Sequence, residues 1–339
     1  MANIRDISLK CGYSVSTVSK ALNGYSDVSE KTRQIIIKTA RECGYIPNAY
    51  ARALKTNRTF NLGILFIDDQ NNGLTHLHFS HVLNSFKTEA EENGYNITFI
   101  NKRWGDQTIT LLQNCKFRGI EGVCIACVEP DDPEVIELAK SDIPVVSIDY
   151  IFPGRGCILS DNKNDMSELV RYIYSMGHRK IAYIHGNLKA DVTKLRIEGY
   201  VNTLKSLGLE VKPEYMIESF YTNIQATRKA TEKLLQLKDR PTCILLPDDV
   251  SSFGAMEAIE AAGLKIPDDI SIAGYDGVIV SQLVSPKLTT IRQDTVKIGK
   301  EAAKLLIHNI KNPKNPRTEP VIVKGELLIN QSVGPAPKQ

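Results

Sequence analysis

A short segment near the amino terminus, VSTVSKALN (residues 15–23), places hydroxyl groups and one long cation at helical spacing. At 100° per residue one face is apolar and consists of Val15, Val18, Ala21 and Leu22. The opposite face carries Ser16, Ser19, Lys20 and Asn23, with Thr17 at its flank. Serine, threonine and β-branched valine are poor helix formers, so such a helix depends on its neighbours for stability. Its flat, donor-rich face suits hydrogen bonding to phosphates and base edges in the major groove of DNA, although a serine-rich surface helix has the same composition.

Two other groups of residues raise the question of metal or redox chemistry. THLHFSH contains His76, His78 and His81, and three imidazoles within six residues are a potential transition-metal site. No cysteine or acidic residue at a suitable spacing completes that set, so we predict a polar site lining and no metal. Cys124 and Cys127 form a CxxC inside the apolar run EGVCIACV, where buried cysteines act as small hydrophobic residues. Because no GxSxG, P-loop or HExxH motif is present, we expect no enzymatic activity and no cofactor.

The elements around the polar helix predict an all-α head. Asn3 and Asp6 are spaced as a capping box for a helix that ends at Gly12, and Ser29 caps a helix that ends at Gly44. Three short helices with a tight turn between the first two are a helix-turn-helix pattern. Residues 1–59 hold ten Lys and Arg against four acidic residues, a net charge of +6, whereas the remaining residues carry −3. This asymmetry favours a polyanion as the partner of the head.

From residue 60 onward, β-rich runs alternate with amphipathic segments. The runs are LGILFI, YNITFI, EGVCIACV, IPVVSID, KIAYIH, TCILLP and ISIAGYD. Strands that alternate with helices predict an α/β body with parallel sheets covered on both faces. About ten strands are too many for one sheet, so we predict two doubly wound parallel-sheet subdomains with a ligand cleft at the carboxyl ends of their strands.

The apolar runs, the amino-terminal segment and the cysteine count indicate the cellular compartment that we expect. No apolar run reaches the roughly 18 residues that a membrane helix needs, and MANIRDISLK lacks the apolar core of a signal peptide. Seven scattered cysteines, an odd number, fit a reducing compartment. We therefore expect a cytoplasmic protein.

The segments SVSTVSKALNG, VSEKTR and GYIPNAYARAL resemble the head of the lactose-repressor/galactose-repressor (LacI/GalR) family, and the resemblance continues through GHRKIAYIHG, IPDDISIAGYD and SPKLTTIRQD. It implies a DNA-binding domain over 1–46, a hinge helix and linker over 47–59, and a body over 60–335 of periplasmic-binding-protein type. The implied N-subdomain spans about 60–158 and 291–320, and the implied C-subdomain spans about 159–290 and 321–335. The implied DNA contacts are Val15, Ser16, Thr17, Ser19, Lys20, Asn23, Tyr45, Asn48, Ala51, Leu54 and Lys55.

Two of these positions carry specific expectations. Lys20 stands where many members have arginine, which replaces a bidentate contact to guanine by a point charge. Leu54 stands at the family's wedge position, where a hinge helix in the minor groove unstacks a central base step. Simple linker and surface roles are the alternatives.

The resemblance also implies an effector site in the cleft of the body. Arg196 matches an arginine that donates to ligand hydroxyls and Asp276 a carboxylate that accepts from them, a combination suited to vicinal hydroxyls. The other implied contacts are Phe220, Asp248, Asp249, Asp161, His76 and Phe79. Gly277 and NNGLTHLHF depart from the family pattern.

Together these observations predict a homodimeric transcriptional regulator, a repressor, that binds double-stranded operator DNA under the control of a small carbohydrate effector. One alternative is the same fold with a purine or a phosphoprotein as corepressor. Another is a sugar receptor that does not act on DNA, which the basic head disfavours.

Overall fold

The computed structural model describes residues 2–22, 25–45, 58–67 and 73–337. The chain forms two compact units, residues 1–59 and residues 60–339. Among the described residues, no helix is both long and apolar enough to cross a membrane.

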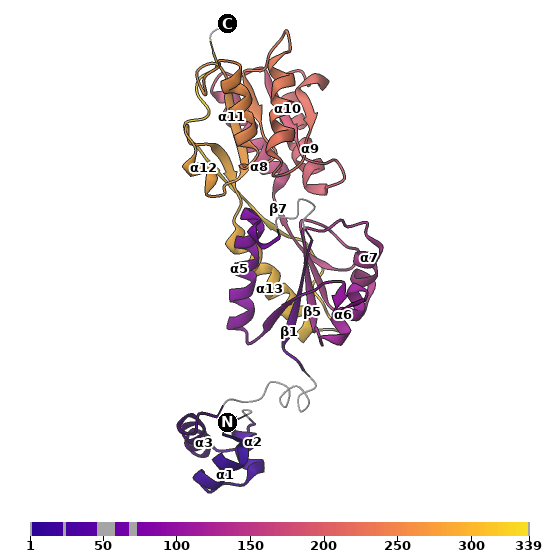
Figure 1. Cartoon of the computed structure of the whole chain (residues 1–339), viewed down its shortest axis with the longest axis vertical. Coiled ribbons are helices and arrows are strands. Elements are labelled where there is room, and N and C mark those ends of the chain that lie inside the picture. Colours follow the sequence, from indigo (N-terminus) through magenta and orange to yellow (C-terminus); the bar gives the residue numbers. More distant parts are fainter. Residues whose placement is uncertain (1, 23–24, 46–57, 68–72, 338–339) are drawn as a thin grey trace. The chain divides into compact units, whose positions relative to one another are not determined.

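In its described residues the head contains three helices, α1 (Ile4–Cys11), α2 (Val15–Leu22) and α3 (Glu30–Glu42) (Figure 1). The predicted capping box is present, since Asn3 Oδ1 accepts from the backbone of Asp6 and Asp6 Oδ2 accepts from the backbone of Asn3 at 2.8 Å. Gly12 ends α1 with a left-handed φ of 75°, which favours glycine. The three helices enclose a small core of Ile7, Val18, Ala21, Val28, Ile36 and Ala40. The helix-turn-helix prediction is confirmed.

The body contains two six-stranded sheets, as the alternation of strands and helices predicts. The first sheet has the order β13-β7-β6-β5-β1-β2 and is parallel throughout. Its strands are β1 (Asn61–Phe66), β2 (Asn96–Phe99), β5 (Gly122–Ala126), β6 (Val145–Ile148), β7 (Gly156–Ser160) and β13 (Val321–Val323). The second sheet has the order β14-β12-β11-β10-β8-β9, in which only the β12–β14 pair is antiparallel. Its strands are β8 (Ile181–His185), β9 (Met216–Glu218), β10 (Cys243–Leu245), β11 (Ser271–Asp276), β12 (Thr289–Arg292) and β14 (Glu326–Leu328).

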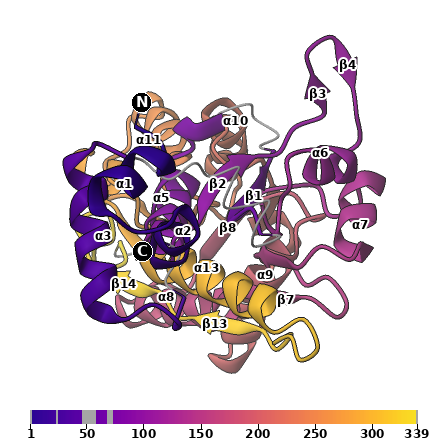
Figure 2. The same cartoon turned by 90° about the horizontal axis from the view of Figure 1, so that it is seen from below.

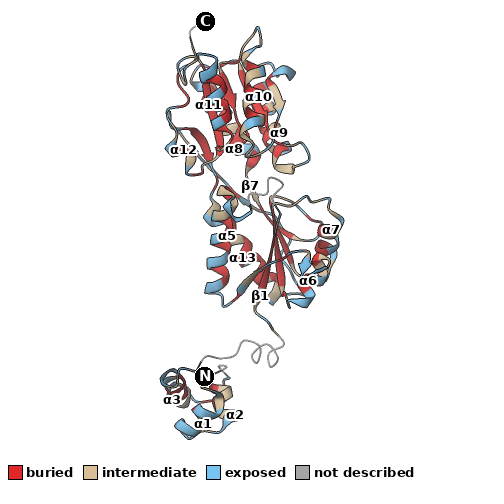
Figure 3. Cartoon of the chain, viewed as in Figure 1, coloured by how far each residue is buried: buried red, intermediate tan, exposed pale blue. Residues whose placement is uncertain are grey.

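Helices cover both faces of each sheet, so the central strands are buried, whereas the edge strands β2, β9, β13 and β14 are partly exposed (Figure 3). On the first sheet, α5 (Leu77–Glu92) and α13 (Thr295–Lys311) pack on one face, and α6 (Leu111–Phe117) and α7 (Pro133–Lys140) on the other. On the second, α8 (Asn162–Ser175) and α9 (Asp191–Ser206) lie opposite α10 (Ile224–Leu235) and α11 (Ser252–Ala261). The short α12 (Val280–Leu283) follows β11. This is the doubly wound architecture that the sequence predicts.

The chain crosses between the subdomains at positions that differ from the predicted boundaries. Strand β7 extends through Ser160 in the first sheet, so the first crossing follows residue 160 rather than 158. Strand β12 pairs with β11 in the second sheet, which moves the return from 291 to after 292. Strand β13 pairs with β7, so residues 321–323 belong to the first subdomain and not to the second. Strands this short carry no periodicity of their own, and their partners decide which sheet they join.

Several elements of the first subdomain are absent from the sequence-based prediction, among them the strands β7 and β13, a helix and a hairpin. Helix α13 is amphipathic and contributes Ile298, Ala302 and Leu306 to the core, where it packs along α5. A two-stranded hairpin, β3 (Arg103–Trp104) and β4 (Gln107–Thr108), projects from the body (Figure 2). Trp104 is half exposed at 48% and stacks on Phe117 with ring centroids 4.4 Å apart.

Candidate functional site

The exposed face of α2 carries most of the predicted DNA-contacting side chains that the structure describes. Val18 and Ala21 are buried in the head core, and Ser16 is exposed. Val15 is 41% exposed, so its assignment to the packing face is wrong, because it lies in the first turn of α2, beyond the reach of the core. Its methyl groups therefore lie on the surface of the helix beside Ser16, as a contact to DNA requires.

The remaining polar groups of α2 already have partners within the head. Ser14 Oγ accepts from the backbone N–H of Thr17 at 3.1 Å and pairs with the Thr17 hydroxyl at 2.8 Å, which caps the helix. Lys20 Nζ lies 2.5 Å from Asp27 Oδ2. This hydrogen bond raises the pKa of Lys20 and lowers the pKa of Asp27. Ser19 is half-buried.

The predicted hinge contacts fall largely outside the described part of the chain. Tyr45 is the exception: it packs against the head core, and its backbone N–H donates to Ala40 at 2.9 Å. The predicted positions Asn23, Asn48, Ala51, Leu54 and Lys55 lie outside the described residues.

Polar side chains surround Arg196 at the carboxyl ends of the strands of the second sheet, and together they form what we call the polar cluster. Arg196 projects from α9, is only 4% exposed, and stacks its guanidinium on the ring of Tyr275 at 3.6 Å. Its Nε donates to Asn162 Oδ1 at 2.7 Å and its Nη1 to the carbonyl of Pro247 at 3.1 Å. Nη2 lies 3.8 Å from Asp276 Oδ1, beyond hydrogen-bond range. The Nη2 edge of the guanidinium therefore faces the carboxylate of Asp276 without a direct hydrogen bond to it.

Asp276 ends β11 with a left-handed φ of 102°, and Gly277 continues with a φ of 67°. A side chain at Gly277 would collide with Arg292 at 2.4 Å, which explains why glycine stands here. Gln293 Nε2 donates to Asp276 Oδ1 at 2.7 Å. The unusual backbone turns the carboxylate toward Arg196 at the strand edge where ligands bind in such sheets.

Asp248 and Asp249, two of the predicted effector contacts, accept hydrogen bonds from the protein itself. Asp248 accepts from the backbone of Thr222 at 2.7 Å and from the Ser251 hydroxyl at 2.8 Å. Asp249 accepts from the Thr290 hydroxyl at 2.6 Å and from the backbone of Val278 at 2.8 Å. Burial raises the pKa of both carboxyls, most strongly that of Asp249. Both residues therefore hold the loops next to Phe220 and Asp276 in place.

Two aromatic residues follow β9, and the second of them, Tyr221, approaches Arg196. Phe220 is 51% exposed, whereas the ring of Tyr221 lies 5.7 Å from the guanidinium and its hydroxyl pairs with Thr193 at 2.8 Å. A side chain at Gly186 would lie 2.3 Å from this ring, so glycine leaves the space that Tyr221 fills. Asp161 lies at the first crossing, where it accepts from Asn164 at 2.9 Å.

The start of α5 brings the first subdomain to this cluster. His76 caps the helix and Phe79 packs against Phe66 at 5.4 Å. His78 is 4% exposed, and its Nδ1 has no hydrogen-bond partner among the described residues. Burial lowers the pKa of His78 to about 4, although the charge of Asp276 acts to raise it. The neutral imidazole of His78 is thus buried, and the charges of Asp276 and Arg196 both act on its pKa.

Asp149 contributes a second carboxylate from the first sheet. It follows β6 with a left-handed φ of 63°, and burial raises its pKa to about 6 even though Arg196 acts to lower it. The polar cluster therefore joins groups from both sheets.

The two questions of metal and redox chemistry have structural answers. Within the described residues, no three His, Cys, Asp or Glu side chains are arranged to hold a metal ion. All seven cysteines are free thiols, and Cys124 is buried in β5, where burial raises its pKa to about 12.

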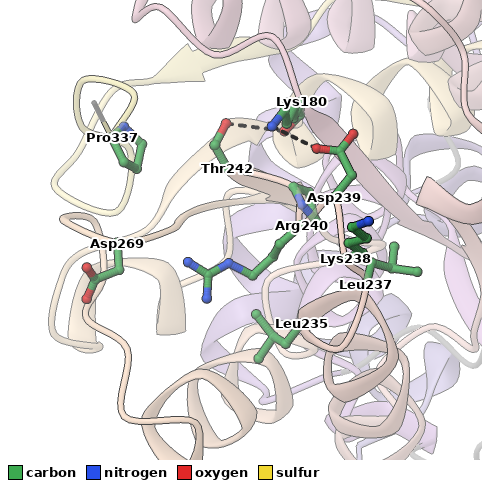
Figure 4. Close-up of a pocket in the computed structure, with 10 residues that line it drawn as sticks. Lys180, Leu235, Leu237, Lys238, Asp239, Arg240, Thr242, Asp269 and Pro337 are labelled. Atoms are coloured by element: carbon green, nitrogen blue, oxygen red, sulfur yellow. Dashed lines mark hydrogen bonds and ion pairs between the residues drawn. The ribbon is translucent and has the colours of Figure 1, made fainter. Parts of the chain in front are cut away.

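A separate hollow lies at the opposite edge of the second sheet (Figure 4). It measures about 440 Å³ and lies beside Lys180, Thr242 and Asp269, which precede β8, β10 and β11. Lys180 pairs with Asp239 at 2.7 Å in its wall. Since it lies at the amino ends of the strands, it is distinct from the Arg196 cluster.

Similarity to known proteins covers almost the whole chain. The family described as "Bacterial regulatory proteins, lacI family" matches residues 3–48, and a "Periplasmic binding protein-like domain" matches residues 170–333. The ribose operon repressor of Haemophilus influenzae is 33% identical over 338 residues, which cover 98% of this chain and 99% of that protein. The chain belongs to the lacI family.

Two further similarities extend over the same length. The transcriptional repressor PurR of Mannheimia succiniciproducens is 29% identical over 98% of this lacI-family chain and 99% of its own. The crystal structure of the lac repressor dimer bound to operator and an anti-inducer shares the fold, with a TM-score of 0.79 and 23% identity over 98% of this chain and 99% of that one. As a lacI-family member, the chain is a DNA-binding transcriptional regulator with a ligand-binding body.

Three residues of the cluster, Asp149, Tyr221 and Gln293, are absent from the sequence-based prediction for this lacI-family regulator, whereas His78 belongs to the predicted polar site lining. Asp149 follows an apolar strand directly, as Asp276 does, and that shared position was the available signal. His78 precedes the buried Val82 and Phe86 at intervals of four, a spacing that predicts its burial. Tyr221 and Gln293 had no such signal, since loop geometry and an unpredicted strand place them.

Proposed function

We propose that this lacI-family regulator is a cytoplasmic, homodimeric repressor that binds a palindromic operator under the control of an uncharged sugar in the cleft between its subdomains. The supporting observation is the gap of 3.8 Å between Arg196 Nη2 and Asp276 Oδ1. A ligand hydroxyl that lies beside this pair of atoms can bridge them, because it accepts from the guanidinium and donates to the carboxylate, and a neighbouring hydroxyl can repeat the pattern. Two-fold symmetry is the commonest assembly and matches a palindromic operator.

The charges of the cluster favour a neutral ligand over an acidic one. Among the residues that the structure describes, Arg196 is the cation of the cluster, and Asp276 and Asp149 carry the opposite charge from the two sheets. A uronate or a phosphate would add an anion to a site that already has two carboxylates. Hydroxyl groups satisfy both the guanidinium and the carboxylates without any added charge. The similarity to a ribose operon repressor supports the same class.

A purine is the second candidate, because PurR matches the chain over the same length. Phe79 and Tyr221 offer aromatic faces near the cluster, and a planar base can stack on such faces. The two candidates differ in the groups they offer Arg196, since a purine has ring nitrogens where a sugar has vicinal hydroxyls.

The test is a thermal-shift and calorimetric screen of the full chain against neutral pentoses and hexoses, a hexuronate and purine bases, followed by operator titrations with each binder. We expect a neutral sugar to raise the melting temperature, to bind in a 1:1 ratio and to change operator affinity. Binding of a purine or a hexuronate with no response to neutral sugars would contradict the sugar assignment. A sugar that binds without changing operator affinity would contradict its role as the effector.

A further inference from the structure

The ion pair between Lys20 and Asp27 joins the polar face of α2 to the turn before α3. Lys20 Nζ lies 2.5 Å from Asp27 Oδ2, and the side chains are 43% and 52% exposed. An exposed pair of this kind contributes little to folding stability. The effect of this ion pair that matters here is its effect on the position of the Lys20 ammonium on the DNA-facing helix α2.

The turn that carries Asp27 is fixed on both sides. The backbone N–H of Tyr25 donates to the carbonyl of Lys20 at 3.1 Å, and Arg33 Nη2 donates to the carbonyl of Tyr25 at 2.7 Å. Val28, the next residue after Asp27, is buried at 7% exposure in the head core. The backbone on both sides of Asp27 is therefore anchored to α2, to α3 and to the core, which limits the positions that its carboxylate can take beside Lys20.

A lysine ammonium has three donors, and the pair with Asp27 uses one of them. Among the described residues the ammonium has no second acidic partner, and its side chain is 43% exposed. An unpaired lysine is attracted to the backbone phosphates of any DNA, which adds affinity without sequence information. A carboxylate at 2.5 Å restricts the ammonium to one region of the helix face and repels phosphates from that region.

We propose that Asp27 is a specificity-determining residue of this regulator: it holds the Lys20 ammonium for contact with base edges and withholds it from the phosphates of non-operator DNA. The role concerns DNA alone and does not depend on the identity of the effector. Asp27 is a positioning residue in this proposal, since it acts through Lys20.

The test compares binding to two duplexes of equal length, an operator selected from random sequences by the parent chain and a duplex without that sequence. In Asp27→Asn we expect about 3- to 10-fold tighter binding to the second duplex and a steeper salt dependence by about one unit of log K against log salt. Operator affinity changes less, so the ratio of the two affinities falls about 3- to 10-fold. An unchanged ratio overturns the proposal.

Two controls separate this role from a general gain of positive charge. Glu42→Gln makes the same change of charge on α3, where Glu42 lies 3.9 Å from Lys10, and it should leave the affinity ratio unchanged. In a Lys20→Ala background, Asp27→Asn should no longer alter the ratio. If Glu42→Gln lowers the ratio as far as Asp27→Asn does, or if the effect of Asp27→Asn persists without Lys20, the proposal is wrong. Melting curves of every variant establish that the head is folded.

Discussion

Gln293 joins the carboxylate of Asp276 to the two strands that lead from one subdomain to the other. Its Nε2 donates to Asp276 Oδ1 at 2.7 Å, and its Oε1 accepts from the hydroxyl of Ser160. Ser160 ends β7 at the first crossing, and Gln293 follows β12 at the second. A ligand that changes the hydrogen bonding of Asp276 therefore also affects Gln293. Gln293 lies at the second crossing and is hydrogen-bonded to Ser160 at the first.

Gln293→Ala should weaken the coupling between ligand and DNA more than it weakens ligand binding. The variant keeps Arg196 and Asp276 but leaves the Ser160 hydroxyl without its partner, at a cost of about 1–3 kcal/mol in the free energy of unfolding. We expect the ligand-induced change in operator affinity to fall by about 3-fold or more, because coupling depends on differential affinity for two states. Paired titrations with ligand and with operator measure both quantities. Gln236→Ala, an exposed residue at the end of α10, is the control. Full coupling in Gln293→Ala would contradict the expectation.

Arg196→Ala should abolish the response to ligand while leaving operator affinity nearly unchanged. A buried charged hydrogen bond contributes about 2–4 kcal/mol, which corresponds to roughly 30- to 1000-fold in ligand affinity. Arg196 lies in the body and not in the head that carries α2. Calorimetry and gel shifts measure the two affinities, and Lys205→Ala, on the exposed side of α9, is the control. A ligand response equal to that of the parent would show that the effector binds elsewhere.

Asp165→Asn should remove part of the pH dependence of stability. Burial raises the pKa of Asp165 to about 6 from an unfolded value near 3.8, and its Oδ1 has no partner among the described residues. The folded state then holds a proton that the unfolded state releases, so stability falls as the pH rises through about 4 to 6. Above this range the carboxyl group of Asp165 is ionised in the folded protein, and the full loss of folding stability is present. A shift of this size corresponds to as much as about 3 kcal/mol.

We therefore expect Asp165→Asn to be more stable than the parent at pH 7.5 and nearly equal to it at pH 4. Asparagine can still accept from the backbone of Gly325, which donates to Asp165 Oδ2 at 3.0 Å. Urea unfolding followed by circular dichroism at both pH values measures the difference. An equal or lower stability of the variant at pH 7.5 would mean that the carboxylate is not strained in the folded protein.

A chain that starts at residue 60 should fold, bind ligand as the parent does and have no affinity for operator DNA. The boundary between the compact units falls at Thr59 and Phe60, and the four apolar cores of the body draw only on residues after it. Gel shifts, sedimentation and ligand titration give the three readouts. Operator binding by the truncated chain would refute the assignment of DNA recognition to the head.

The sequence alone determined the class of each part of the protein. Caps such as Asn3 and Ser29 act on backbone groups three residues away, so local composition was enough to predict α1 and α3. The alternation of apolar strands with amphipathic segments predicted parallel sheets, because a buried parallel strand must be apolar throughout. The motifs that resemble the LacI/GalR family identified Arg196 and Asp276, which the structure brings to 3.8 Å.

Only the tertiary structure decided which polar residues are bonded within their own loops and which lie beside Arg196. Asp248 and Asp249 have the same side chain as Asp149, yet internal donors occupy the first two and the third lies at the junction of the two sheets. Phe220 and Tyr221 are neighbours, yet it is Tyr221 whose hydroxyl pairs with Thr193 and whose ring lies near Arg196. Lys20 and Asp27 are separated by seven residues, and only the packing of α3 on the turn between them brings their charges together. Burial and hydrogen bonding depend on neighbours that are distant in the sequence, so no local pattern could assign them.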